Sequence, residues 1–252
     1  LRGDMLQAEE IYREVLSKNQ QHPIALRGLA DVLAVVGDHQ QAWVLAQNVI
    51  KINPEHPRTW LIAANLQVVL GFPEKTEYYL EQGELASIQP LVVRQALFRY
   101  WRSHDQFKKA QERLLAWTAE VPNEAEYWLM LAYLYYDRNC FDDAEHALKH
   151  AAEIDWQVGD VALIRFYEKR NRLGVARKCA EQLVRRDTSI MKSHGLLTEV
   201  LYRQERYDEA ISALDKGLKI EPYRLSLVRQ KVGMLLAQEY FSEAVSCARQ
   251  LV

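Results

Sequence analysis

Small and large apolar residues recur along this chain at a fixed interval, separated by polar stretches. The clearest marker is an alanine that returns every 34 residues, with one interval of 32 residues and one replacement, Thr76. The series consists of Ala8, Ala42, Ala110, Ala144, Ala176, Ala210 and Ala244. A fixed period of this length predicts a stack of equivalent helical hairpins, each covering the apolar face of the next.

Within one period the apolar positions define two helices. In the unit that begins at residue 125, the first helix carries apolar or small residues at positions 4, 7, 8 and 11, which are Trp128, Leu131, Ala132 and Tyr135. Positions 20, 24 and 27 define one face of a second helix in the same way. Small residues at 8, 20 and 27 let the helix backbones approach, and large residues at 4, 7, 11 and 24 fill the space between them. Tryptophans at such positions, including Trp60, Trp101, Trp117 and Trp128, are expected in the core.

Turn residues fall between the two predicted helices and after the second. Position 15, held by Gly3, Gly37 and Gly71, is expected to turn the chain within a hairpin. Position 32, held by Pro54, Pro122 and Pro222, is expected to stop the second helix. This combination of Trp, Leu, Ala, Tyr, aromatic, Ala and Pro at fixed offsets resembles the tetratricopeptide repeat, and the resemblance covers the whole chain. It implies an all-α, right-handed α-solenoid of about seven units and ~15 helices.

The repeat lattice also divides the chain into units. A partial unit spans 1–22, a truncated one spans 225–252, and between them lie 23–56, 57–90, 91–124, 125–156, 157–190 and 191–224. We expect one superhelical domain, 1–252, belonging to a longer protein, because both ends fall inside a unit. The short interval lies near Gly159 and Asp160. There we expect Asp160 to cap a helix, with either a change of superhelical pitch or a late helix start.

Composition excludes several classes of function. The formal net charge is -2, no stretch is long and apolar enough for a membrane span, and the three cysteines have no metal-ligand spacing. The thiols favour a cytoplasmic setting, with the periplasm as the alternative if a signal sequence has been removed. No phosphate-binding loop, zinc-protease motif or nucleophile elbow occurs, so we expect neither an enzyme nor a cofactor. His146 and His150 form one metal-like pair, for which a solvated pair is the better interpretation.

Core packing does not account for the residue types on the remaining face of the first helices. In the implied superhelix the first helices line the concave side, and their positions 2, 5, 9, 12 and 13 form what is here called the inner face. Nine basic residues occupy it: Arg27, Arg58, Arg99, Arg102, Arg165, Lys169, Lys192, Arg203 and Arg229. Five acidic residues accompany them: Asp31, Glu126, Asp137, Glu168 and Glu199. Tyrosines interleave with these charges, and Arg and Tyr are enriched at binding hot spots.

The pattern therefore predicts a scaffold that binds a peptide or partner protein carrying acidic and aromatic or aliphatic groups. The predicted groove, centred on the fourth to seventh units, comprises Arg99, Arg102, Tyr133, Tyr136, Arg165, Lys169, Lys192, Tyr202, Arg203 and Arg229. Relatives that clamp the carboxylate tail of chaperones use Lys and Asn at slots where this chain has Arg27 and Asp31, so that activity is not expected. The asparagine ladder of relatives fused to a sugar-transferring enzyme is also absent.

Three other functions stay open at the level of sequence. The chain could be the docking or assembly region of a larger glycosyltransferase, sulfotransferase or polysaccharide exporter, which the sequence beyond Val252 would decide. Single-stranded nucleic-acid binding is disfavoured because the molecule is acidic overall. Self-association through the truncated ends remains an alternative, since uncovered helical faces can pair.

Overall fold

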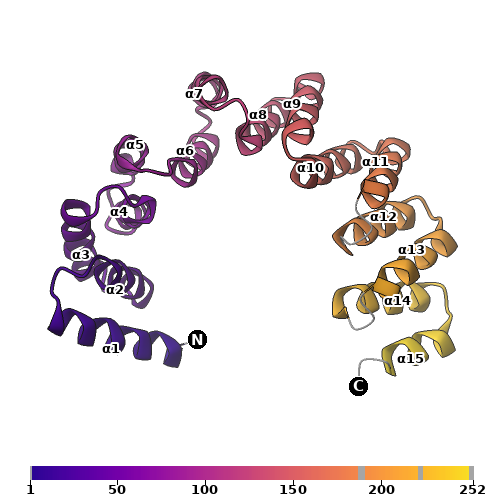
Figure 1. The fold of residues 1–252 in the computed structure, drawn as a ribbon, viewed down its shortest axis with the longest axis horizontal. Coiled ribbons are helices and arrows are strands. Elements are labelled where there is room, and N and C mark those ends of the chain that lie inside the picture. The colour runs from indigo at the N-terminus through magenta and orange to yellow at the C-terminus, as the bar shows by residue number, and fades with distance from the viewer. Residues whose placement is uncertain (1, 187–190, 221–223, 250–252) are drawn as a thin grey trace. The chain divides into compact units, whose positions relative to one another are not determined.

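The computed structural model describes residues 2–186, 191–220 and 224–249 as fifteen α-helices and one short 3-10 helix, without strands in those ranges (Figure 1). The helices are α1 (Arg2–Lys18), α2 (Pro23–Val36), α3 (His39–Ile52), α4 (Pro57–Val69), α5 (Thr76–Ala86), α6 (Leu91–Ser103), α7 (Phe107–Glu120), α8 (Ala125–Asp137), α9 (Phe141–Ile154), α10 (Trp156–Lys169), α11 (Leu173–Arg186), α12 (Met191–Arg203), α13 (Tyr207–Ile220), α14 (Leu225–Ala237) and α15 (Phe241–Arg249), with η1 (Pro73–Lys75) between α4 and α5. The all-α hairpin architecture is confirmed.

The chain forms two compact units, residues 1–110 and residues 111–252. In the first unit α2 packs on α1, α3 and α4, and α4 packs on α3, α5 and α6. In the second unit each helix from α8 to α15 packs on the next, and α10 also contacts α8 and α12. Five first helices therefore lie against their own second helix and against the first helix of a neighbouring hairpin: α2, α4, α8, α10 and α12.

The repeated alanine is buried in every hairpin from α2–α3 onward that retains it. Ala42, Ala144 and Ala210 have no exposed surface, and the substituted Thr76 is also buried. Around Ala42 the side chains of Leu29, Leu33, Ile62 and Leu66 form one apolar cluster from α2 and α4. The predicted role of the small residue at position 20, to let helix backbones approach, is confirmed.

The tryptophans at the predicted core positions differ in burial. Trp60, Trp101 and Trp117 are buried, as expected. Trp128 is only half-buried, because its ring stacks on His150 at 4.5 Å on the helix surface, so its assignment to the core is wrong. Its indole N–H still donates to the Pro122 carbonyl at 3.3 Å, and the indole N–H of Trp60 donates in the same way to the Pro54 carbonyl at 2.6 Å. Pro222 lies outside the described residues.

Position 15 adopts a left-handed backbone in seven consecutive hairpins. The φ angle is +103° at Gly37 and +87° at Gly71. The other five positions carry a residue with a side chain at φ between +54° and +61°: Asp105, Asn139, Asn171, Glu205 and Glu239. Gly3, expected in a turn, lies within α1 instead. The turn is thus fixed by the repeat geometry even where glycine is absent, at a conformational cost for the residues with a Cβ.

The 32-residue interval shortens a connection to a single residue. Asp155 is both the C-cap of α9 and the N-cap of α10. Its carboxylate accepts a hydrogen bond from the backbone N–H of Gln157 at 2.9 Å. Asp160 lies inside α10, so its expected capping role is wrong, as is a late helix start. Gly159 is buried in α10, where an added Cβ would lie 2.3 Å from the backbone of Ala152. Close contact between α9 and α10 therefore requires a glycine at this position.

Candidate functional site

The predicted groove residues all lie on first helices of hairpins. Arg99 and Arg102 are exposed on α6, in the first unit. The rest are in the second unit: Tyr133 and Tyr136 on α8, Arg165 and Lys169 on α10, Lys192, Tyr202 and Arg203 on α12, and Arg229 on α14. Of these, Tyr136 is half-buried, the side chain of Lys192 is outside the described residues, and the others are exposed.

A charge network occupies the inner face between α10 and α12. Arg165 contacts Glu168 at 3.0 Å and Glu199 at 2.7 Å, and Arg203 lies 3.8 Å from the other oxygen of Glu168. Glu168 was expected to point into the groove, but it is 2% exposed, so that expectation is wrong. Burial raises the pKa of the Glu168 carboxyl, and the neighbouring Arg165 opposes that shift. Two of the predicted groove arginines are thus already engaged with carboxylates.

The aromatic groups of the second unit stand beside this network. The ring of Tyr136 packs edge-on against Phe141 and Phe166, with centroids 5.6 and 6.0 Å apart. The ammonium of Lys169 lies 5.5 Å from the centre of the Tyr136 ring, within reach of a cation–π interaction. Tyr133 and Tyr202 are 44% and 38% exposed, which is high for such large rings. The surface that results is aromatic and flanked by cations.

Positive charge on the inner face is unequally shared between the units. In the first unit four arginines, at positions 27, 58, 99 and 102, face one acid, Asp31. In the second unit five basic residues face four acids, and the network around Glu168 compensates two of them. The basic excess that the sequence places on the inner face as a whole therefore belongs mainly to residues 1–110.

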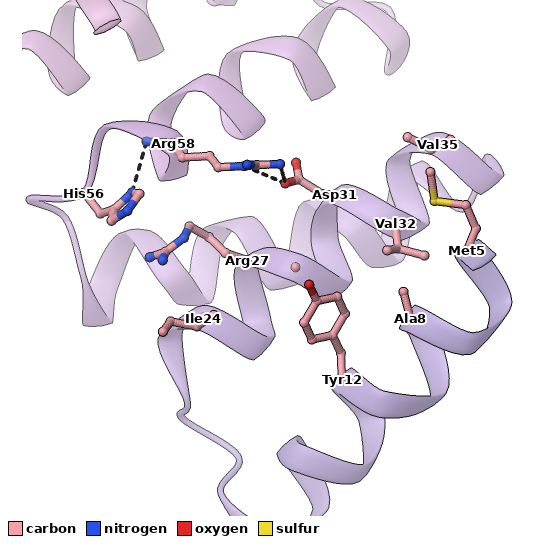
Figure 2. A pocket seen from close by; sticks show the side chains of 11 residues that line it. Met5, Ala8, Tyr12, Ile24, Arg27, Asp31, Val32, Val35, His56 and Arg58 are labelled. Carbon is pink, nitrogen blue, oxygen red and sulfur yellow. Dashed lines mark hydrogen bonds and ion pairs between the residues drawn. The ribbon is translucent and has the colours of Figure 1, made fainter. Parts of the chain in front are cut away.

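That first unit also holds a pocket that the sequence did not reveal. A cavity of about 520 Å³ opens between α1 and α2, with the start of α4 at one end (Figure 2). We call it the α1–α2 pocket, and its lining is Met5, Ala8, Tyr12, Ile24, Arg27, Gly28, Asp31, Val32, Val35, His56 and Arg58. One end is polar and the other aliphatic. Side-chain positions were needed to recognise it as an open cavity.

The polar end is held by hydrogen bonds that orient its cations. The guanidinium of Arg58 donates to Asp31 at 2.8 Å, its backbone N–H donates to the ring of His56 at 3.2 Å, and the Arg27 guanidinium donates to Asn53 at 2.8 Å. Burial and the nearby Arg58 lower the pKa of Arg27. Burial, Arg27 and Arg58 lower the pKa of His56 in the same way. The shifts agree in direction with an excess of positive charge at this end of the pocket.

Neither unit shows a metal centre or a membrane span within the described residues. No group of three or more His, Cys, Asp or Glu side chains there could hold a metal ion. The rings of His146 and His150 lie 5.0 Å apart, and His150 stacks on Trp128. No described helix is long and apolar enough to cross a bilayer. The cysteines Cys140, Cys179 and Cys247 are free thiols.

Comparisons with known proteins agree with the hairpin architecture. Residues 161–224 match the family model described as tetratricopeptide repeat. A solved tetratricopeptide repeat protein from Parabacteroides merdae superposes with a TM-score of 0.55 at 14% identity, covering 93% of both chains. The Cut9–Hcn1 hetero-tetramer of the APC/C gives a TM-score of 0.50 at 13% identity, covering 93% of this chain and 46% of that one. At such identities the likeness concerns the fold alone.

One curated relative is similar in sequence over part of the chain. The human protein O-mannosyl-transferase TMTC1 is 26% identical over 105 residues, which are 41% of this chain and 12% of that protein. Stacked hairpins without strands in the described ranges define an α-helical repeat scaffold. Residues 161–224 match tetratricopeptide repeats, and the stacked hairpins have the fold of solved tetratricopeptide repeat proteins.

Proposed function

We propose that the inner face of residues 111–252 binds a segment of a partner protein, and that the chain recruits this partner without chemistry of its own. The segment is extended or helical and carries aromatic or aliphatic groups together with acidic ones. The observation that carries the proposal is the exposure of Tyr133 and Tyr202 on α8 and α12, the helices that flank α10. Rigid aromatic rings of this kind are the residues that most often anchor protein interfaces.

Two cations support an acidic partner at this face. Among the described residues, no carboxylate pairs with Lys169 or with Arg229, and both side chains are exposed. Arg165 and Arg203, in contrast, pair with Glu168, so we do not expect them to bind a carboxylate of the partner. A partner carboxylate is therefore expected at Lys169 or Arg229, with aromatic or aliphatic contacts at Tyr133 and Tyr202.

The test is a quantitative affinity capture with three forms of the chain. The inner-face variant carries Lys169→Ala, Tyr202→Ala and Arg229→Ala. The control variant carries the same changes on second helices or at a turn, Lys178→Ala, Arg185→Ala and Tyr240→Ala, all at exposed positions. The inner-face variant is expected to lose captured partners by about tenfold while the control keeps them. An identical partner set for all three forms would sink this proposal.

Arg99 and Arg102 form a separate, smaller part of the prediction because they belong to the first unit. Both are exposed on α6, and Arg99 makes no ion pair with any described residue. The double change Arg99→Ala and Arg102→Ala, made alone, measures whether they add to partner capture. No change in capture would remove these two arginines from the proposed site.

A second candidate is that the chain is the docking region of a larger sugar-transferring enzyme. The match to a human O-mannosyl-transferase over 105 residues favours it. Material captured on the chain from cells would then transfer mannose to an acceptor protein, measured with labelled donor. Capture of partners with no transferase activity above that of beads alone would contradict this alternative and leave the scaffold proposal intact.

A further inference from the structure

A hairpin in the second unit shows how this chain holds a guanidinium between two second helices. Arg172 lies just before α11, at position 16 of its unit, and pairs with Glu145 of α9 at 3.0 Å. Its guanidinium carbon also lies 5.2 Å from the centre of the Tyr167 ring on α10. A carboxylate for the planar donors and an aromatic face for the charge are the contacts that arginine prefers.

Lys109 has the same kind of surroundings in the first unit. Its ammonium donates to Glu77 at 2.8 Å and to Glu81 at 2.9 Å, both on α5. It also lies 5.5 Å from the centre of the Trp101 ring. Trp101 and Tyr167 both occupy position 11 of their units. The repeat therefore places a cation beside a second helix and an aromatic ring in two separate hairpins.

A cavity of about 620 Å³ lies at the corresponding place between α13 and α15, over α14. We call it the α13–α15 pocket, and its lining includes Asp208, Lys231, Leu235, Tyr240, Glu243 and Cys247. Leu235 and Cys247 are buried, whereas Tyr240 is 47% exposed. Asp208 and Glu243 are also exposed. The pocket is thus closed by apolar side chains at the bottom and open along a polar rim.

The residues at two repeat positions explain why this pocket is open. Position 11, which carries Trp101 and Tyr167 beside the bound cations, is the smaller Leu235 here. Position 16, which is Arg172 in the α10–α11 hairpin, is Tyr240. The pocket therefore has an exposed aromatic ring at its rim and lacks the cation of position 16.

Two carboxylates at the rim have no partner in the part of the chain that the structure describes. Asp208 lies in the first turn of α13, and Glu243 lies in the first turn of α15. Lys231 also lines the pocket, but Asp215 holds its ammonium at 2.6 Å. The helix dipole favours acidic residues in a first turn, and these two also line one cavity beside Tyr240. The rim therefore carries uncompensated negative charge next to an aromatic face.

We infer that the α13–α15 pocket binds an arginine side chain of a partner polypeptide. The guanidinium lies between Asp208 and Glu243, and the aliphatic stem lies along Leu235, since arginine stems pack on apolar surface. Two carboxylates on different helices favour the planar fork of arginine over the point charge of lysine. This inference does not rest on the inner-face proposal, because the pocket opens between second helices and selects a basic group.

The probe is a short fluorescein-labelled peptide with a single Arg at its centre, flanked by Leu. A second peptide carries citrulline in place of Arg, which keeps the shape of the side chain and removes its charge. Binding to the 252-residue chain is measured by fluorescence anisotropy. The Arg peptide is expected to bind about tenfold more tightly than the citrulline peptide.

A double variant of the chain removes the two carboxylates and keeps the size of their side chains, Asp208→Asn with Glu243→Gln. The matched control is Asp142→Asn with Asp143→Asn, at the same positions, 18 and 19, in the first turn of α9. All four residues are exposed, and the two double variants change the net charge equally. The pocket variant is expected to bind the Arg peptide about tenfold more weakly than wild type, and the control is expected to bind it as wild type does.

A second variant fills the pocket and leaves its charge unchanged. Ser246 is an exposed lining residue, so Ser246→Trp places a ring in the cavity. Ser242→Trp is the control, because Ser242 is exposed on the same helix but does not line the pocket. Only Ser246→Trp is expected to weaken binding of the Arg peptide, and circular dichroism melts of all variants verify that they are folded.

Four results would overturn the inference. A wild-type chain that binds neither peptide at ~1 mM has no arginine site of this kind. Equal affinity for the two peptides rejects recognition of a guanidinium, and equal loss in the two double variants rejects the location. Displacement of the Arg peptide by an equal concentration of free arginine would identify a small guanidinium compound, instead of a partner polypeptide, as the ligand.

Discussion

The packing of α9 on α10 makes a quantitative prediction about one glycine. Gly159→Ala would place a Cβ 2.3 Å from the Ala152 backbone, and backbone atoms cannot rotate away as a side chain can. The helix itself gains about 1 kcal/mol from alanine over glycine. Separating two well-packed helices costs about 3 kcal/mol, at the upper end of overpacking effects. The expected net change is a loss of about 2 kcal/mol, or roughly 4–8 °C in Tm.

Gly233→Ala provides the matched control for this experiment. Gly233 lies within α14, and nothing lies within 4 Å of its added Cβ, so the same substitution should stabilise by about 1 kcal/mol. Both variants are compared with wild type by urea denaturation followed by circular dichroism. Opposite signs for the two variants are expected. If Gly159→Ala is as stable as wild type or behaves like Gly233→Ala, the close approach of α9 and α10 is not what the glycine serves.

Three further predictions follow from the described contacts. Glu239→Gly should stabilise by about 1 kcal/mol because it relieves a left-handed residue at φ +61°, whereas Gly37→Ala should destabilise by a similar amount, both measured by thermal melting. Ala42→Leu should cost about 1–3 kcal/mol, while Ala8→Leu, which lines an open pocket, should change stability by less than about 0.5 kcal/mol in urea titrations. Burial raises the pKa of Glu168 in the folded state. The protonated side chain therefore stabilises the fold at pH values below the ordinary Glu pKa, and this contribution is lost as the pH rises through the raised pKa. Glu168→Gln should therefore gain stability relative to wild type between pH 4 and pH 7, and a constant difference would contradict that sign.

Residue periodicity predicted the helical hairpins and most of their buried faces. The alanine at position 20 and its apolar neighbours determine which faces are buried, because helix packing depends on side-chain size at fixed spacing. The cluster of Ala42 with Leu29, Leu33, Ile62 and Leu66 follows from that rule. A turn at position 15 was predicted at three glycines; it is confirmed at Gly37 and Gly71 and wrong at Gly3, which lies within α1. Its presence at Glu205 and Glu239 requires the repeat geometry, since isolated glutamates do not favour it.

The candidate sites were less predictable because they depend on distances across helices. Glu168 occupies an inner-face position in the sequence. In the structure it is nevertheless buried, and both Arg165 and Arg203 approach its carboxylate. Asp155 rather than Asp160 caps α10, because a two-residue deletion can shorten a connection instead of delaying a helix. The α1–α2 pocket depends on how the side chains of α1, α2 and the start of α4 are placed, which periodicity alone does not specify.

The claim that partners bind the inner face is tested most directly by hydroxyl-radical footprinting of the chain with a captured partner bound. Tyr133, Tyr202 and Tyr240 are similarly exposed, at 44%, 38% and 47%, so their oxidation rates in the free chain should be comparable. The account predicts that the bound partner protects Tyr133 and Tyr202 and leaves Tyr240 unchanged. Unaltered oxidation of Tyr133 and Tyr202 in the complex would contradict it.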